Sequence, residues 1–244
     1  NPDPVQTTWI ERGDLRMVDP IAASNIIPAG HCWLGAPQTE PPRRVVVITG
    51  ESGIGKSVAA VRMTRHLHTG TAPDQLPIGL YFVVPWYVNT MGQSSALVEV
   101  ETASGGTDAD AKNIRNQRAT DLVTNMVLHA MRALSRDFHG SACSHAQQDI
   151  ETLPEIKLVI ILDEVGSHPE FTRAVTASAQ SIHGKLCKSA RPYFKDIAIV
   201  VAGTGVDTTV TAGTRPETYC RVALQATDDE FVRKLWKHLR PHDS

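Results

Sequence analysis

Short apolar runs, rich in Val and Ile, alternate along the chain with longer segments of helical periodicity. The runs predict buried strands at residues 45–49, 79–84, 158–162 and 197–201, with 219–224 as a candidate fifth strand. The segments between them predict helices at residues 56–68, 110–136 and 169–187. Because strands that are buried on both faces read as continuous apolar runs, this alternation predicts an α/β fold with a mostly parallel sheet and helices on both faces.

The segments outside this alternation predict irregular or peripheral structure. Residues 1–43 are rich in proline and predict an irregular lead-in with room for one short helix. Residues 89–110 are polar and rich in Gly, Ser and Thr, which favours a long loop. Thr227 opens a T-x-x-E capping box, so residues 227–244 are expected to form a C-terminal helix or the start of a helical lid. We therefore expect a core at residues 44–226 between two flanking segments.

Composition and charge narrow the classes of protein that fit this fold. The 244 residues are 41% hydrophobic and 20% charged, which is typical of a globular chain and excludes a largely disordered one. The formal charge of −2 argues against general nucleic-acid binding, although a local basic patch at residues 185–195 leaves a nucleic-acid or acidic partner open. The apolar runs are too short to cross a bilayer, so no membrane association is expected. The four cysteines are far apart, and the chain opens on Asn1 without a signal segment; we expect a reduced, intracellular protein of the cytoplasm or nucleus, processed or excised from a longer chain.

A glycine-rich turn joins the first predicted strand to the first predicted helix. Residues 50–57 match the pattern G-x-x-x-x-G-K-[ST], in which glycines allow backbone N–H groups to face inward around a phosphate. The N-terminus of the following helix adds partial positive charge, Lys56 can reach the β- and γ-phosphates, and the Ser57 hydroxyl can bind Mg²⁺. A plain glycine turn between strand and helix is the alternative. The candidate nucleotide-binding residues are Gly50, Glu51, Ser52, Gly53, Ile54, Gly55, Lys56, Ser57 and Val58.

Two acidic residues, Asp163 and Glu164, follow the third predicted strand directly. In open parallel sheets ligands bind beyond the carboxyl ends of the strands, so the pair lies where a ligand is expected. We assign Asp163 to the Mg²⁺ shell and Glu164 to the orientation or deprotonation of an attacking water, because phosphoryl transfer depends on positioning and charge neutralisation. The alternative is a pair of solvated acids that cap the next segment.

The glycine-rich turn and the acidic pair resemble the Walker A and Walker B motifs of P-loop NTPases. The glutamate beside the Walker B aspartate is similar to the group that includes the AAA+ and STAND ATPases, and the resemblance extends over about residues 44–240. It implies ATP and Mg²⁺ as ligands, with Lys56 and Glu164 as catalytic residues. It also implies a sensor-1-like role for Thr204, against the γ-phosphate or the attacking water; a simple Gly-Thr-Gly turn is the alternative there.

The resemblance has a narrower form and clear departures. The strings at residues 160–165 and 201–205 also resemble the ATPase modules of retrotransposon-hot-spot and crinkler-type proteins. No complete lid with a sensor-2 arginine follows residue 240, and no motif fixes an arginine finger. Arg191 and Arg215 are candidates for that role because each is expected in a loop beside a late strand, with solvated surface arginines as the alternative.

Other activities fit part of the pattern. Residues 163–166 also match the D-x-x-G of a GTPase, but no Asn-Lys-x-Asp follows to recognise guanine. A P-loop kinase would need a phosphoryl acceptor, and the loop at 89–110 is a candidate substrate lid for it. His139, Cys143 and His145 lack the fourth ligand and the regular spacing of a metal site. We expect Mg²⁺-dependent ATP hydrolysis coupled to conformational change, with a protein partner or self-association; a nucleotide-gated switch with little turnover and a P-loop kinase remain as alternatives.

Overall fold

The computed structural model describes residues 15–17, 45–66, 78–105, 107–142, 156–189, 194–206 and 219–224. The expected C-terminal helix at 227–244 and most of the N-terminal lead-in lie outside these residues. The strands and helices that the apolar pattern predicts between residues 45 and 224 all have counterparts in the described part of the chain.

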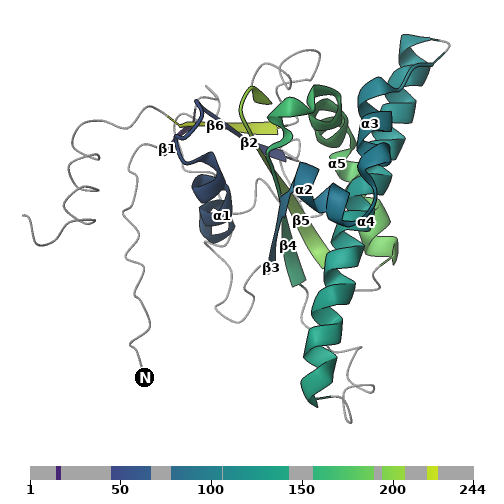
Figure 1. The fold of residues 1–244 in the computed structure, drawn as a ribbon. Coiled ribbons are helices and arrows are strands. Elements are labelled where there is room, and N and C mark those ends of the chain that lie inside the picture. The colour runs from purple at the N-terminus through teal and green to yellow at the C-terminus, as the bar shows by residue number, and fades with distance from the viewer. Residues whose placement is uncertain are drawn as a thin grey trace, which may run out of the picture.

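Six strands form one sheet, in the order β1-β6-β2-β5-β4-β3 (Figure 1). The strands from β2 to β6 pair in parallel with their neighbours, and β1 pairs antiparallel with β6. The prediction of a mostly parallel sheet, including the candidate fifth strand, is therefore confirmed. The bounds of the strands are Leu15–Met17 (β1), Val45–Thr49 (β2), Ile78–Val83 (β3), Ile156–Asp163 (β4), Phe194–Ala202 (β5) and Tyr219–Leu224 (β6).

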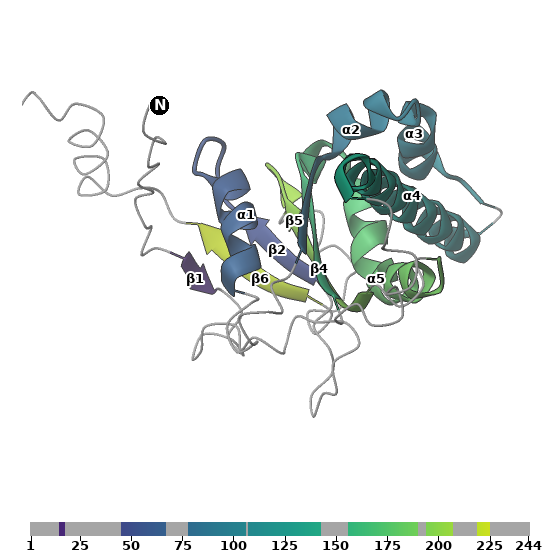
Figure 2. The same ribbon diagram turned by 90° about the horizontal axis from the view of Figure 1, so that it is seen from below.

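Helices cover both faces of this sheet. Figure 2 shows the sheet as a middle layer, with α1 on one face and α2, α3, α4 and α5 on the other, which confirms the predicted α/β arrangement. Among the described helices, none combines the length and the apolar character that a membrane span requires. Their bounds are Lys56–His66 (α1), Val84–Thr90 (α2), Ser94–Thr102 (α3), Asp108–Ala142 (α4) and Pro169–Ser189 (α5), with a short 3₁₀ turn at Val165–Ser167 (η2).

Alternation along each strand divides the apolar core between the two faces. In β2, Val45 and Val47 belong to the cluster under α2 to α5, whereas Val46 and Ile48 belong to the cluster under α1. All four side chains are buried, as expected for a parallel strand that is covered on both faces. The small side chain of Ala60, also fully buried, lets α1 lie close to the sheet. The position of α1, which begins directly after the glycine-rich turn, is thus fixed by core packing.

The expectation of a long loop at residues 89–110 is wrong. Gly92, with a φ of +67°, ends α2 and turns the chain into α3. Leu97 and Val100 of α3 are buried in the core cluster that also contains α4 and α5. The composition of this segment favoured a loop because a helix of nine residues is too short to show repeated helical periodicity. The substrate lid that the kinase alternative placed here is therefore replaced by a helix built into the core.

One additional strand and the ends of one helix also differ from the sequence prediction. Strand β1 lies within the lead-in that was expected to be irregular, because a three-residue edge strand pairs through its backbone and needs no apolar run. Helix α4 begins at Asp108 and continues to Ala142, beyond both predicted ends. Its start is set by the N-cap residue Thr107, whose hydroxyl accepts the Asp110 N–H at 3.1 Å and donates to the Asp110 carboxylate at 2.8 Å.

Candidate functional site

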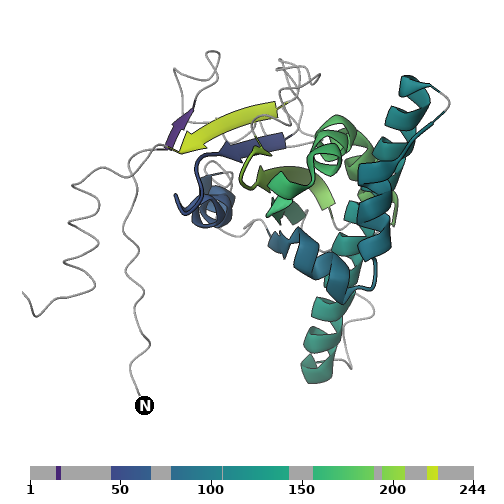
Figure 3. The ribbon, with the colours of Figure 1, turned by 45° about the horizontal axis from the view of Figure 1, so that its top comes forward.

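Three strand ends meet at the carboxyl edge of the sheet. Strand β2 runs into the glycine turn (residues 50–57), β4 ends at Asp163, and β5 runs into Gly203. Because these strands are parallel and β5 lies between β2 and β4, their ends share one edge, with the end of β5 in the middle. In Figure 3 the top of the molecule, where this edge lies, comes forward. The topology thus brings together three motifs that are far apart in the sequence.

The glycine turn adopts a conformation that glycine tolerates and other residues rarely do. Gly50, Gly53 and Gly55 have φ values of +150°, +77° and +94°. A Cβ on Gly50 would also lie 3.0 Å from Cγ2 of Ile54 and 3.2 Å from the carbonyl oxygen of Leu224 in β6. Ile54 is buried in the cluster under α1, whereas Gly53 is exposed. The turn is therefore anchored to the core at one point and open to solvent at another.

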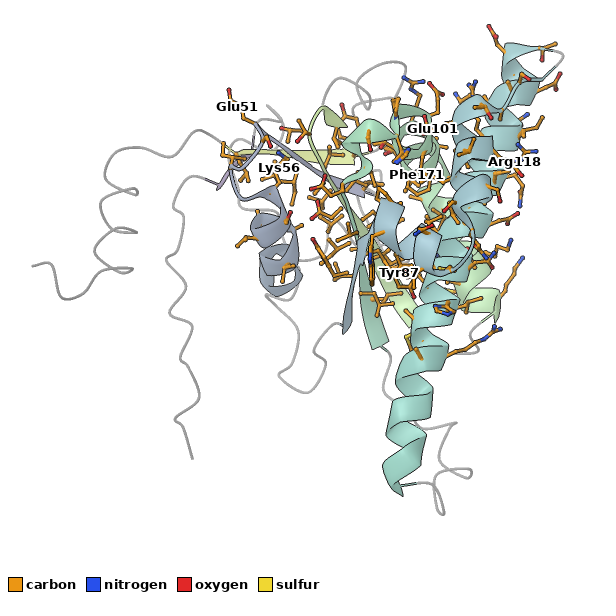
Figure 4. The ribbon with its side chains drawn as sticks, in the orientation of Figure 1. Glu51, Lys56, Tyr87, Glu101, Arg118 and Phe171 are labelled. Atoms are coloured by element: carbon orange, nitrogen blue, oxygen red, sulfur yellow. The ribbon has the colours of Figure 1, made fainter. Side chains whose placement is uncertain are left out.

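Lys56, the first residue of α1, lies across this turn and is only 8% exposed. Its Nζ donates to the carbonyl oxygens of Gly50 at 3.0 Å and Glu51 at 2.5 Å. Figure 4 labels Glu51 and Lys56 together at the top of α1. Both acceptors are neutral, so these two contacts leave the positive charge of the ammonium group in place. A buried cation at the N-terminus of a helix is a favourable environment for an anion such as phosphate.

Asp163 is almost wholly buried and has hydrogen bonds to both of its carboxylate oxygens. The Tyr81 hydroxyl donates to Oδ2 at 2.5 Å, and the backbone N–H of Glu164 donates to Oδ1 at 2.9 Å. Burial first, and then the hydrogen bond and negative charge of Asp163, raise the pKa of Tyr81 to about 12. Ser57 of the glycine turn acts on the pKa of the same phenol in the opposite direction and lowers it. Tyr81 therefore hydrogen-bonds Asp163 of β4 within reach of Ser57.

The sequence analysis did not identify Tyr81 as a site residue. Its neighbours Leu80 and Phe82 belong to the cluster under α2 to α5, so the alternation of a strand turns Tyr81 to the face of α1. In the β3–β4 register Tyr81 pairs with Ile161, two residues before Asp163 on the same face. The face of Tyr81 follows from the apolar pattern in β3, but its pairing with β4 requires the structure.

The turn after β4 packs backbone against backbone on the turn after β5. A Cβ on Gly166 would lie 1.6 Å from the carbonyl oxygen of Thr204, and a Cβ on Gly203 would lie 2.6 Å from the nitrogen of Gly166. Glu164, two residues before Gly166, is exposed and adopts the left-handed conformation, with φ of 59° and ψ of 28°, which is unusual for a residue other than glycine. This strain accompanies the sharp turn that follows β4. This packing explains why residue 166 is a glycine, so the D-x-x-G match requires no contact with a guanine nucleotide.

The contact between these turns predicts a large stability effect. Gly166→Ala is expected to lower the free energy of unfolding by about 2–3 kcal/mol, because its Cβ cannot fit unless the two turns separate. Gly184→Ala in α5 is the matched control: nothing lies within 4 Å of its Cβ, and alanine favours the helix by about 0.5–1 kcal/mol. Urea unfolding followed by circular dichroism measures both. Equal stability of the two variants would contradict this description of the edge.

A contact between α3 and the first residues of α5 fixes the start of α5. The Glu101 carboxylate of α3 accepts the backbone N–H of Phe171 at 2.8 Å and that of Glu170 at 3.3 Å, and so caps the N-terminus of α5. Figure 4 shows Glu101 and Phe171 close together at this end of the molecule. Arg115 of α4 pairs with Glu170 at 3.3 Å. Since α5 begins soon after Glu164, α3 and α4 hold the segment that follows the acidic pair.

The remaining candidate residues are placed less centrally. Val58, in the first turn of α1, is 42% exposed. Lys185 of the basic patch forms an ion pair with Asp121 of α4, which offsets one cation of that patch. Arg191 and Arg215, the candidate arginine fingers, lie outside the described residues. The same is true of two members of the histidine–cysteine group, Cys143 and His145, whereas the backbone at 139 belongs to α4.

The groups gathered at this edge fit a phosphate and a hard cation. The Ser57 hydroxyl and the Asp163 carboxylate offer oxygen ligands; Asp163 accepts a hydrogen bond from Tyr81, and Ser57 lowers the pKa of the same phenol. Mg²⁺ prefers oxygen ligands, and it is usually bound by one or two protein side chains together with substrate phosphates. No protein-family model matches this chain, and no curated protein matches it.

Proposed function

We propose that this chain is a P-loop NTPase that binds ATP with Mg²⁺ and hydrolyses it. The observation that supports this most directly is the convergence of the glycine turn, with the buried Lys56, and the buried Asp163 at one edge of the sheet, on the two strands that flank β5. A glycine turn that only joined a strand to a helix would not require a buried lysine folded across it. A pair of solvated acids would not include a carboxylate that is 2% exposed.

Each residue has a role in this proposal that follows from its position. The backbone N–H groups of the glycine turn and the N-terminus of α1 bind the phosphates, and Lys56 exchanges its carbonyl partners for phosphate oxygens. Ser57 and Asp163 would hold Mg²⁺, which neutralises charge on the β- and γ-phosphates when it is bound. Glu164, turned away from the strand, orients or deprotonates the attacking water. Thr204, at the end of the strand between the other two motifs, contacts the γ-phosphate or that water.

The choice of ATP over GTP depends on the resemblance to the AAA+ and STAND group and on the sequence, which has no Asn-Lys-x-Asp to recognise guanine. The D-x-x-G match at residues 163–166 does not favour GTP, because the close packing of Gly166 on Thr204 is sufficient reason for that glycine. A panel of nucleotides therefore belongs in the first binding experiment.

A nucleotide-gated switch with little turnover is the second candidate, and one observation favours it. The backbone of Gly166 touches that of Thr204, so a shift of Thr204 on contact with a γ-phosphate would move η2 and the start of α5. The Glu101 cap would pass this movement to α3. The same contacts would couple hydrolysis to conformational change, so enzyme and switch differ in turnover and share the binding site.

Phosphate release from ATP separates these two candidates. The enzyme is expected to release phosphate in Mg²⁺ and to stop when the metal is chelated. Because an arginine supplied in trans can accelerate phosphoryl transfer by roughly 10³–10⁵, the rate per molecule should rise with protein concentration if the chain self-associates or with an added partner. Nucleotide binding with background phosphate release at every protein concentration would favour the switch. The absence of nucleotide binding would contradict both.

A further inference from the structure

The Tyr81 side chain occupies the place where the two proposed metal-binding groups meet. Its hydroxyl donates to Oδ2 of Asp163 at 2.5 Å, and Ser57 lies near enough to this hydroxyl to lower its pKa. The other carboxylate oxygen of Asp163 accepts the backbone N–H of Glu164 at 2.9 Å. The phenol therefore occupies a carboxylate oxygen that the proposed function assigns to Mg²⁺.

A hydrogen-bond donor and a divalent cation make opposite demands on this arrangement. A carboxylate oxygen that accepts a hydrogen bond from a phenol has less electron density to offer a metal. A buried Asp163 that loses this hydrogen bond needs another partner, because an unsatisfied buried charge is costly. A cation could take the place of that partner.

The position of Tyr81 allows its side chain to rotate away from Asp163. Strand β3 is at the edge of the sheet, and Tyr81 is 42% exposed although its hydroxyl reaches the buried Asp163. Rotation of the side chain away from Asp163 would place the phenol in solvent without opening the apolar core, because its neighbours Leu80 and Phe82 are the residues of β3 that pack in the core.

We infer that Tyr81 competes with Mg²⁺ for Asp163, so that it acts as a positioning residue that must move aside when the metal–nucleotide complex binds. This inference rests on the proposed function and adds to it a residue that sets how strongly nucleotide binding depends on the metal. Tyr81 holds Asp163 in place when no metal is bound and releases it when the metal–nucleotide complex binds.

Calorimetric titration with the imido analogue of ATP, which is not hydrolysed, tests the competition. The dissociation constant is measured in EDTA and in excess Mg²⁺. The value in EDTA divided by the value in Mg²⁺ gives the metal dependence of binding. Tyr81→Phe keeps the ring and removes the hydroxyl, so the ratio is expected to rise about tenfold, because the metal no longer displaces a hydrogen bond to a charged group. Tyr87→Phe is the matched control. It removes a hydrogen bond of 2.9 Å between Tyr87 of α2 and His129 of α4, away from Asp163.

The outcomes separate this inference from the proposed function. A raised ratio in Tyr81→Phe, with an unchanged ratio in Tyr87→Phe, supports the competition. An unchanged or lowered ratio in Tyr81→Phe, while the unmodified protein binds the analogue, overturns it and leaves the proposed function standing. A similar rise in both variants also overturns it, because the effect would not be specific to the phenol at Asp163. Absence of binding to the unmodified protein in both conditions overturns the proposed function and this inference together.

Discussion

Replacement of Lys56 by alanine is expected to weaken the binding of Mg²⁺–ATP by roughly 30- to 150-fold. The lysine is buried across the glycine turn, and in the proposed function it forms charge-assisted hydrogen bonds with phosphate, whose loss would cost about 2–3 kcal/mol. Isothermal titration calorimetry with the imido analogue of ATP measures the change in the dissociation constant without interference from hydrolysis.

Two controls make the result at Lys56 specific. Lys112→Ala removes one exposed cation from α4 and should bind with the affinity of the unmodified protein, which separates a local effect from a change in net charge. Thermal unfolding of Lys56→Ala shows whether the variant is folded. A folded Lys56→Ala variant with unchanged affinity would mean that the glycine turn does not bind phosphate.

Replacement of Glu164 by glutamine is expected to slow ATP hydrolysis by about 10²–10⁴-fold while the affinity for ATP stays within about threefold. Glutamine keeps the shape of the side chain and removes the carboxylate to which the proposed function assigns the attacking water, and general-base catalysis has an effect of about this size. Because Glu164 already has an unusual backbone conformation, the isosteric change avoids adding a new conformational preference. Phosphate release at saturating ATP measures the rate.

Glu99→Gln is the matched control for this experiment. Glu99 lies on the exposed side of α3 and pairs with Arg118 at 3.6 Å, a surface contact of little energetic weight. Its rate should equal that of the unmodified protein. If Glu164→Gln also hydrolyses ATP at the unmodified rate, the assignment of Glu164 as the base is wrong, although the binding site would remain.

The sequence predicted the sheet well because each buried parallel strand carries its own signal. The runs at β2, β4 and β5 are almost continuous in Val, Ile and Leu, and burial on both faces explains this composition. The glycine turn and the acidic pair could be placed at strand ends for the same reason. The order of the strands could not be predicted, because the placement of β5 between β2 and β4 depends on pairing between distant segments.

The parts that the sequence did not predict depend on long-range contacts or on short elements. Helix α3 was missed because its two buried positions, Leu97 and Val100, are too few to show a period. The Glu101 cap joins residues about 70 positions apart, and the Tyr81–Asp163 hydrogen bond joins residues 82 apart. The left-handed conformation of Glu164 also had no signal, since glycine or asparagine is the usual residue there.

Thermal unfolding in the presence of nucleotides shows whether the glycine turn and Lys56 bind the phosphates of a nucleotide. Binding to the folded state must raise the melting temperature, by roughly 5–10 °C for a chain of this size at a hundred times the dissociation constant. We expect this rise with ATP and ADP in Mg²⁺, a smaller rise with GTP, and its loss in Lys56→Ala. An unchanged melting temperature with every nucleotide at millimolar concentration, in a protein that unfolds cooperatively, would contradict phosphate binding by this turn.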